Sequence, residues 1–350
     1  MTIGQRIKQV RKAKNFSLRK LAEKIGVSAM AISKYERDLD VPSSGVLLRL
    51  SQALEVKLDF FFRPSTVNVQ LQAYRKHASL GVKAQEAIQM SIQDWVERYF
   101  EVESLFPDEQ SSNPLPLYPV KSLSDIEEVA LQLRDAWHLG VDPIENLVQL
   151  LEDQGIKVGI ISGFDHFDAC TFHLDHQPVI VTKGGLPGDR QRFNLGHELG
   201  HLVLDIQGDV DPEKAASRFV GAFLVPAKTT RYELGSQRTD LNVNELYMLK
   251  KKYGLSMQAW VYRARDLHII SEGTATCLFQ MFRVRGWHRQ EPGDPYPSEE
   301  PTRMERLVYR ALAEDLISRS RAKELLGKPI QLRWEMETLL THEPAIHSGN

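Results

Sequence analysis

The stretch RFNLGHELGHLVL, residues 192–204, decides how most of the chain is interpreted. It contains an HExxH motif, with His197 and His201 four residues apart. On an α-helix this spacing puts both imidazoles on one face, where they can reach one metal ion. Glu198 lies slightly around the helix and is suited to take a proton from a water molecule that the metal acidifies and to pass it to a leaving amine. The motif therefore predicts a catalytic Zn²⁺ site, with Mn²⁺ as an alternative ion; the competing interpretation is two histidines on a helix surface.

A catalytic zinc ion needs a third protein ligand as well as an open position. The acidic residues that follow the motif are Asp205, Asp209, Asp211 and Glu213. We choose Glu213 because it opens the stretch EKAASRFVGAFLVP, which is typical of a second helix, and a carboxylate in the first turn of that helix can swing to the metal. The residues of this helix that we expect to pack inward are Ala216, Phe219, Val220 and Phe223.

Residues 124–271 resemble the ImmA/IrrE family of metallopeptidases, whose pattern is an HELGH helix followed by a Glu-led, Ala-rich helix. The stretches that carry the resemblance are FDAC, PVIVTKGGLPGDRQRFNLGHELGHLVLD, EKAASRFVGAFLVP and GLSMQAWVYRARDLHIIS, the last of which looks like a closing helix pair. The resemblance implies an α+β zincin-like fold, with His197, His201 and Glu213 as metal ligands and Glu198 as the general base. It also implies a peptidase that relieves repression by cutting a helix-turn-helix repressor.

The chain departs from that family pattern at three positions near the motif. Gly196 replaces the usual alanine, Ser217 replaces the usual asparagine, and Ala215 occupies a position that is often acidic. None of these departures removes a ligand. Glycine costs a helix roughly 1 kcal/mol relative to alanine, so Gly196 is expected to affect stability more than chemistry.

The net charge of −2 conceals two segments of opposite sign. Residues 1–63 hold 13 Lys and Arg but 6 Asp and Glu, a net charge of +7, whereas residues 64–350 carry −9. A basic segment joined to an acidic one suggests a nucleic-acid partner for the first segment only.

The basic segment has the apolar spacing of four or five short helices. A break at Gly26, followed by Ser28 as an N-cap, gives the helix-turn-helix arrangement that lets one helix enter a major groove. The residues expected in its core are Ala22, Ile25, Val27, Ile32 and Tyr35. Those expected to contact DNA bases or phosphates are Ser28, Ala29, Met30, Ser33, Lys34 and Arg37, with Gln5, Arg6, Arg11 and Lys12 as further phosphate contacts.

The stretch SLRKLAEKIGVSAMAISKYERDLDVPSSGVLLRLSQAL resembles the lambda repressor-like (XRE) helix-turn-helix family over about 60 residues. The family often has Gln or Thr where this chain has Ala29 and Ala31, so we expect less hydrogen-bonded base readout and more contact with thymine methyl groups. We expect a double-stranded DNA operator and, because such heads usually read two half-sites, a homodimer with its interface along residues 67–105. The alternative is a helical protein-interaction domain with a solvated basic face.

The whole chain is therefore expected to be multidomain: an all-α helix-turn-helix head, a helical connector and an α+β zincin-like body. The expected boundaries are 1–63 for the head, 64–119 for the connector and a Pro-rich linker, 120–271 for the body, and 272–350 for a C-terminal region of unknown role. The other expected elements are helices at 125–139, 143–154 and 302–326 and strands at 157–161 and 178–182.

The composition excludes several other classes. With 42% hydrophobic and 26% charged residues, the chain is globular rather than disordered, and it has no apolar run long enough to span a bilayer. Its two cysteines, Cys170 and Cys277, cannot form a disulfide framework, so we expect a cytoplasmic protein.

Other polar residues are interpreted conservatively. Cys170, together with His166, His173 and His176, could form a second metal site. We do not expect one, because the stretch ACTFHLDHQPVIV alternates like a strand on which His173 points away from Cys170. Arg190 and Arg192 are candidates either for a substrate carboxylate or for structural salt bridges.

The leading hypothesis is a DNA-binding transcriptional regulator that carries a zinc-dependent endopeptidase domain. Its substrate would be the chain itself, a sister subunit or a separate helix-turn-helix repressor. The alternatives are a repressor whose zincin-like domain is a non-proteolytic sensor or dimerisation module, and a toxin–antitoxin component.

Overall fold

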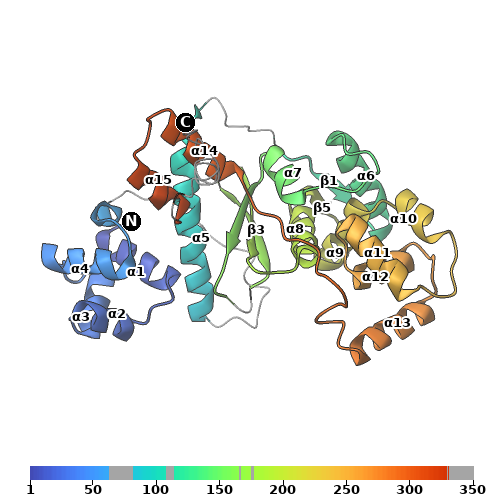
Figure 1. Ribbon diagram of the computed structural model, residues 1–350, viewed down its shortest axis with the longest axis horizontal. Helices are drawn as coiled ribbons and strands as arrows, with labels where there is room; N and C mark the ends of the chain where they lie inside the picture. The colour runs from blue at the N-terminus through green and yellow to red at the C-terminus, as the bar shows by residue number, and fades with distance from the viewer. Residues whose placement is uncertain (63–81, 108–113, 165–166, 175–176, 329, 331–350) are drawn as a thin grey trace, which may run out of the picture. The chain divides into compact units, whose positions relative to one another are not determined.

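The structure is a computed structural model that describes residues 1–62, 82–107, 114–164, 167–174, 177–328 and 330. Parts of the expected connector and linker, together with His166, His176 and residues 331–350, lie outside the described residues. The chain divides into two compact units, one of residues 1–96 and 111–301 and the other of residues 97–110 and 302–350. Figure 1 shows a helical N-terminal head and a body of helices around small sheets, which confirms the expected fold class.

The head forms the expected helix-turn-helix. Ser17 and Ser28 are N-caps whose hydroxyl groups accept hydrogen bonds from Lys20 N and Ala31 N, both at 3.1 Å. Gly26 ends the earlier helix with a φ of +67°, a conformation that glycine adopts without strain. The elements of the head are α1 (Ile3–Ala13), α2 (Leu18–Ile25), α3 (Ala29–Glu36), α4 (Ser44–Leu54) and the 3₁₀ helix η1 (Leu58–Phe62).

The core of the head is the expected one, but two expected phosphate contacts are wrong. Ala22, Ile25 and Ile32 are at most 3% exposed, and Val27 and Tyr35 pack against them. Arg6 is only 2% exposed and donates a hydrogen bond to the side chain of Gln9. Arg11 forms a buried, bidentate ion pair with Glu36, with distances of 2.5 and 2.8 Å. Both guanidinium groups therefore stabilise the head from inside and do not meet a phosphate.

The body contains two small sheets. In the larger one, β2 (Lys157–Ile161) runs parallel to β4 (Gln177–Lys183), which pairs antiparallel with the edge strand β3 (Ala169–Leu174). The smaller sheet pairs β1 (Tyr118–Val120) with β5 (Leu204–Ile206), a pairing that the sequence did not predict. The helices of the body are α6 (Ile126–Ala136), α7 (Leu147–Asp153), α8 (Gly188–Val203), α9 (Pro212–Leu224), α10 (Ala227–Leu234), α11 (Val243–Tyr253), α12 (Met257–Asp266) and α13 (Glu272–Val284).

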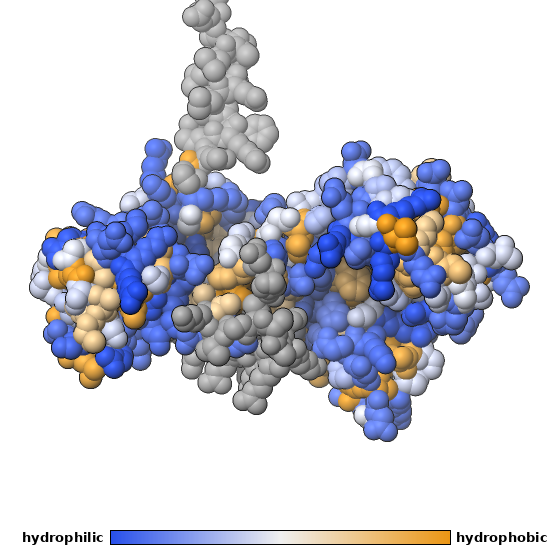
Figure 2. Space-filling model, turned by 90° about the horizontal axis from the view of Figure 1, so that it is seen from below, coloured by the Kyte–Doolittle hydropathy of each residue, from blue (hydrophilic) through white to orange (hydrophobic). Residues whose placement is uncertain are grey.

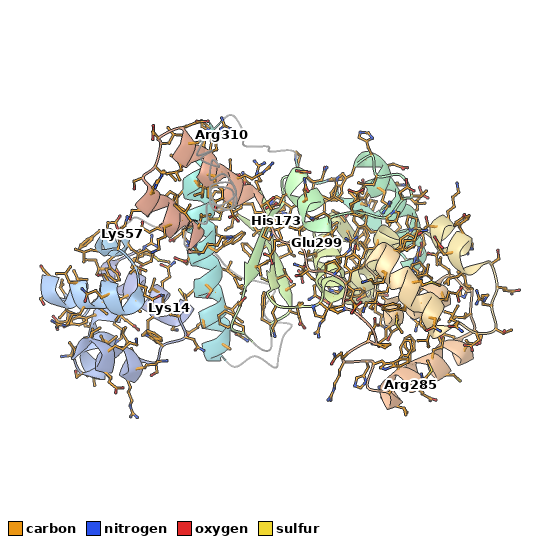
Figure 3. The ribbon with its side chains drawn as sticks, in the orientation of Figure 1. Lys14, Lys57, His173, Arg285, Glu299 and Arg310 are labelled. Atoms are coloured by element: carbon orange, nitrogen blue, oxygen red, sulfur yellow. The ribbon has the colours of Figure 1, made fainter. Side chains whose placement is uncertain are left out.

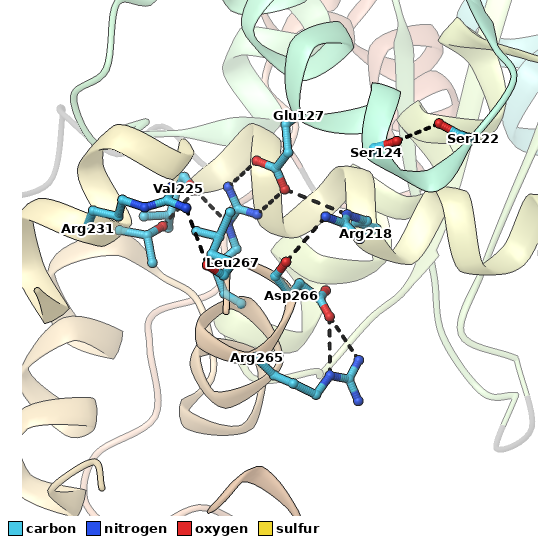
Figure 4. Close-up of polar contacts among 11 residues, drawn as sticks. Ser122, Ser124, Glu127, Arg218, Val225, Arg231, Arg265, Asp266 and Leu267 are labelled. Carbon is cyan, nitrogen blue, oxygen red and sulfur yellow. Dashed lines mark hydrogen bonds and ion pairs between the residues drawn. The ribbon is translucent and has the colours of Figure 1, made fainter. Parts of the chain in front are cut away.

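A buried polar network ties α9 to its neighbours. Arg263 of α12 is 2% exposed; it donates to the carbonyl of Val225, just after α9, and forms an ion pair with both oxygens of Glu127 on α6, at 2.5 and 2.6 Å. Arg218 of α9 also reaches Glu127 and the carbonyl of Asp266, as Figure 4 shows. Three helices are thus held together by groups that would be costly to bury without partners.

The second compact unit has its own small core. It contains the end of α5 (Val82–Glu103), α14 (Arg303–Ala313) and α15 (Arg319–Leu326), packed through residues that include Val102, Val308 and Leu325. The single helix expected over residues 302–326 is wrong, because Asp315 has a φ of +55° and Ser318 caps a new helix.

The polar surface agrees with the composition. On the face shown in Figure 2, hydrophilic residues cover most of the described surface and apolar residues form small separate areas. No helix among the described residues is both long and apolar enough to cross a membrane.

The two helices that carry the predicted ligands, α8 and α9, approach each other closely at two glycines. A methyl group at Gly200 would lie 3.1 Å from the Cα of Ala216 and 3.2 Å from the ring of Phe219, and one at Gly196 would lie 3.2 Å from Val220. As expected, the inward residues of α9, Ala216, Phe219, Val220 and Phe223, are fully buried. Gly196, just before HELGH, and Gly200, within it, therefore have a packing role: they let α9 lie directly against the motif helix.

We expect Gly200→Ala to lower the free energy of unfolding of the body by about 1 kcal/mol. Forcing a methyl group into a filled contact typically costs about 1–3 kcal/mol, which exceeds the roughly 1 kcal/mol that alanine gains in helix propensity. Gly273→Ala in α13 is the control, because its new methyl group would meet nothing closer than 3.7 Å. Denaturant unfolding followed by tryptophan fluorescence measures both, and a Gly200→Ala midpoint at or above that of the wild type would contradict the packing role.

Candidate metal centre

Both motif histidines project from α8 toward the same point. The Nε2 atoms of His197 and His201 are 3.1 Å apart, and the two rings meet edge to face with centroids 4.8 Å apart. Both side chains are partly exposed, at 18% and 23%, so that solvent and solutes can reach them. The helix and the shared face expected from the HExxH spacing are confirmed.

Glu213 reaches the same point from the first turn of α9. Asp211 is the N-cap of this helix, and its carboxylate accepts hydrogen bonds from the backbone N–H groups of Glu213 and Lys214. The Glu213 carboxylate then lies 3.1 Å from Nε2 of His197 and 3.5 Å from Nε2 of His201. Asp211, which was also weighed as a ligand, is instead engaged in starting the helix that carries Glu213.

The three side chains form a compact cluster of donor atoms. One ligand atom from each of His197, His201 and Glu213 lies within 4.8 Å of the others, and among the described residues no other group of three His, Cys, Asp or Glu side chains meets this condition. Of the residues considered for a second metal site, the structure describes two: His173, which is exposed on β3, and Cys170, which is buried. The donor set of the cluster is two imidazole nitrogens and one carboxylate.

The carboxyl group of Glu198 has an unusual environment. Its burial, together with the negative charge of Glu213, raises the pKa of Glu198 to about 8. The pKa of the Cys170 thiol is also raised, by burial and by the charge of Glu198, which makes this thiol unreactive. The motif helix thus places a second carboxyl group, held in a poorly solvated position, beside the cluster.

Ser217 has a role that the sequence did not reveal. Its hydroxyl group lies 3.3 Å from Nδ1 of His197, the ring nitrogen that faces away from the cluster. A partner on the outer nitrogen fixes the orientation of a ligating imidazole and selects its tautomer. The signal in the sequence is the spacing: Ser217 is four residues after Glu213 and so lies on the same face of α9.

The two arginines at the start of α8 differ in their surroundings. Arg190 is exposed and pairs with Asp168 at 3.0 Å. Arg192 is fully buried and pairs with Glu299 at 2.5 Å, so it is a structural group and does not meet a substrate carboxylate.

The residues expected to contact DNA lie on and around α3. Met30, Lys34 and Arg37 are exposed, whereas Ala29 and Ser33 are partly buried. Ser28 is exposed but its hydroxyl group accepts the hydrogen bond that caps α3, and Arg37 Nε donates to the carbonyl of Ser33 at 3.1 Å. Lys34, Arg37 and Met30 therefore present the largest accessible side chains of the expected set.

Comparison with known proteins identifies two domains. Residues 7–61 match the family described as helix-turn-helix, and residues 151–265 match the family described as IrrE N-terminal-like domain. The resemblances inferred from the sequence are thus confirmed. The chain thus carries a helix-turn-helix segment followed by a segment similar to the IrrE N-terminal-like domain.

The curated relatives match this chain over segments of about 57–77 residues. The transcriptional regulator SinR of Bacillus subtilis is 49% identical over 57 residues, which cover 16% of this chain and 51% of SinR. The regulator ImmR of the same organism is 31% identical over 68 residues, 19% of this chain and 54% of ImmR. The chain spans about half the length of the curated relatives that it matches. The crystal structure of the pheromone receptor Rgg2 of Streptococcus dysgalactiae aligns over 93% of this chain and 99% of Rgg2, at 14% identity and a TM-score of only 0.17.

Proposed function

We propose that this chain, which joins a helix-turn-helix domain to an IrrE-like domain, is a DNA-binding transcriptional regulator that carries a zinc-dependent endopeptidase. The observation that carries the proposal is the convergence of His197, His201 and Glu213 beside Glu198. The proposed substrate is a helix-turn-helix repressor or the chain itself, and the proposed effect of cleavage is relief of repression.

The donor spacing supports zinc. Zinc bonds of about 2.0–2.1 Å in a tetrahedral arrangement separate neighbouring ligand atoms by about 3.3 Å. The two Nε2 atoms are 3.1 Å apart, and Glu213 offers a different oxygen to each of them, Oε2 at 3.1 Å from His197 and Oε1 at 3.5 Å from His201. Three protein ligands leave one position open, which is the composition of a catalytic rather than a structural zinc site. Mn²⁺ is the alternative ion, but it favours more oxygen ligands than this cluster provides.

Glu198 is the proposed general base. A zinc ion held by the cluster would supply Lewis acidity toward a peptide carbonyl and would acidify water. The positive charge of a cation held beside Glu198 would lower its pKa from the value of about 8 that burial and Glu213 give it, and so favour the carboxylate. This carboxylate would accept a proton from the attacking water and deliver it to the leaving amine nitrogen. Ser217 would orient His197, and the rigid contact of α8 with α9 would keep Glu213 in place. A purely structural metal site has no need of Glu198, which favours the peptidase over the sensor alternative.

The head is the proposed DNA-binding part. It carries a net charge of +7, and SinR and ImmR, which it resembles, are named transcriptional regulators. Lys34 and Arg37 would contact phosphates, and Met30 would contact a base edge through apolar atoms. We also propose a homodimer on a two-half-site operator. Ile88 and Ile92 of the expected interface are fully buried within the protomer, so the described part of that segment offers little apolar surface to a partner.

His201→Ala is expected to lower Zn²⁺ affinity at least about 100-fold, because the cluster loses one of its three protein ligands. His173→Ala is the matched control, since His173 is an exposed histidine of the same domain outside the cluster. Competition with a chromophoric chelator measures both constants. Equal affinities for the wild type and His201→Ala would refute the proposed ligand set.

Glu198→Gln is expected to retain zinc but to lower the rate of peptide cleavage about 100- to 10,000-fold, the range for loss of a general base. Purified protein is incubated with Zn²⁺, alone and with helix-turn-helix repressors from the same genome, and the products are identified by mass spectrometry. Asp205→Asn, an exposed carboxylate just after α8, is the control and should cleave like the wild type. Cleavage by Glu198→Gln at the wild-type rate would refute the proposed peptidase activity. If DNA binding and transcription of a reporter gene are the same for Glu198→Gln and the wild type, the alternative of a non-proteolytic sensor is favoured.

Lys34→Ala combined with Arg37→Ala is expected to weaken DNA binding and to reduce the slope of log K against log salt by about one for each phosphate that the head no longer neutralises. Lys57→Ala is the control, because Lys57 lies at the opposite end of the head from α3 (Figures 1 and 3). Binding is measured by fluorescence anisotropy on operator fragments selected from random duplexes. Failure of the wild type to bind any duplex in a salt-dependent manner would refute the DNA-binding proposal.

A further inference from the structure

Residues 291–299, which follow α13, run as an irregular segment against the start of the motif helix. We call this segment the strap. It lies beyond residues 151–265, the part of the chain that matches the IrrE-like domain, but within the same compact unit of the structure. In Figure 1 it is part of the chain between α13 and α14, and Figure 3 labels Glu299 near its end.

The backbone of the strap is bonded directly to the first turn of α8. The N–H of Gly188 donates to the carbonyl of Tyr296 at 2.8 Å, and a side chain at Gly188 would collide with the carbonyl of Pro297. The side chain of Gln191 exchanges two hydrogen bonds with the backbone of Glu299, both at 2.7 Å. The contact thus depends on the absence of a side chain at Gly188 and on the amide group of Gln191.

The side chain of Glu299 closes the contact from inside. One carboxylate oxygen accepts from Arg192 at 2.5 Å and the other from the backbone N–H of Val148 at 2.8 Å. Arg192 is fully buried, donates also to the carbonyl of Ile144, and lies over the ring of Tyr296. Because a buried guanidinium is stable only when paired, Arg192 ties α8 to the strap.

A second anchor lies at the other end of the strap. The carboxylate of Glu291 pairs with Lys250 at 2.9 Å and accepts from the backbone N–H groups of Met257 and Gln258 at the start of α12. Lys250 also pairs with Asp189, in the first turn of α8, at 3.1 Å. Positions 188, 189, 191 and 192 of α8 are therefore all held by the strap, directly or through Lys250.

We propose that the strap holds the motif helix in the position that the metal centre requires and that Glu299 is a positioning residue. By fixing the first turns of α8 through Arg192, Glu299 sets the place of His197, Glu198 and His201 relative to Glu213 on α9. This role rests on the proposed function, and it assigns to residues 291–299 a task within the region whose role the sequence left open.

Glu299→Gln tests the proposal, because it removes the charge that pairs with Arg192 and keeps the backbone bonds to Gln191. We expect Zn²⁺ affinity to fall about 10- to 100-fold, as for other groups that orient ligands from outside. Amide hydrogen exchange over residues 188–196 should become faster while exchange in α2 and α3 stays unchanged. In the cleavage assay kcat should fall with KM unchanged. Glu299→Asp, which keeps the charge, should recover part of the zinc affinity.

Glu300→Gln is the matched control, because Glu300 is exposed beside the strap and should behave as the wild type. If Glu299→Gln does not fold, Glu299→Asp gives the same comparison with a smaller change. The proposal would be overturned if the folded variant, Glu299→Gln or Glu299→Asp, bound zinc and exchanged the amides of α8 as the wild type does. A lowered unfolding midpoint of that variant would not rescue it. A wild type that binds no zinc or cleaves no substrate would instead refute the proposed function, and amide exchange would still decide on the strap.

Discussion

The close approach of α8 and α9 is the constraint on which the site depends. Gly196 and Gly200 leave no side chain between the helices, and the Cα of Ala216 and the side chain of Val220 fill the space. At this distance a carboxylate in the first turn of α9 lies 3.1 Å from Nε2 of His197. A larger residue at Gly200 would press on the backbone of α9 at Ala216, whereas one at Gly196 would meet only the side chain of Val220. The motif therefore combines two functions, since its charged and aromatic residues face the cluster while its glycines face the partner helix.

Buried ion pairs outside the cluster hold these helices in place. The cluster itself is not a source of stability, because Glu198 and Glu213 repel each other and burial opposes the charged form of Glu198. The two helices are stabilised instead by Arg263 at the end of α9 and by Arg192 at the start of α8. Each of these arginines is buried and forms an ion pair with a carboxylate from a distant part of the chain. This division of roles is common in functional sites, where the reactive groups are destabilising and the surrounding packing is not.

Local patterns predicted much of the molecule, and long-range pairing explains the remainder. The HExxH helix, the α9 helix begun by Glu213 and the helix-turn-helix of the head follow from apolar spacing and capping residues within one or two turns. The burial of Arg11 required Glu36, 25 residues away, and that of Arg192 required Glu299, 107 residues away. The periodicity of a sequence does not reveal such a distant partner. A phosphate contact was therefore expected for Arg11, and a substrate contact and a structural salt bridge both stayed open for Arg192. The break in residues 302–326 was missed because both halves share one amphipathic pattern.

X-ray absorption spectroscopy of the zinc-loaded wild type tests most directly whether α8 and α9 together form one metal centre. We expect two imidazole nitrogens at about 2.0–2.1 Å and a carboxylate oxygen at about 2.0–2.2 Å in a four-coordinate shell. The imidazole signal should be halved in His197→Ala, and the number of oxygen neighbours should change in Glu213→Gln. A shell without imidazole nitrogens, or one that stays the same in both variants, would contradict the assignment of His197, His201 and Glu213 to one site.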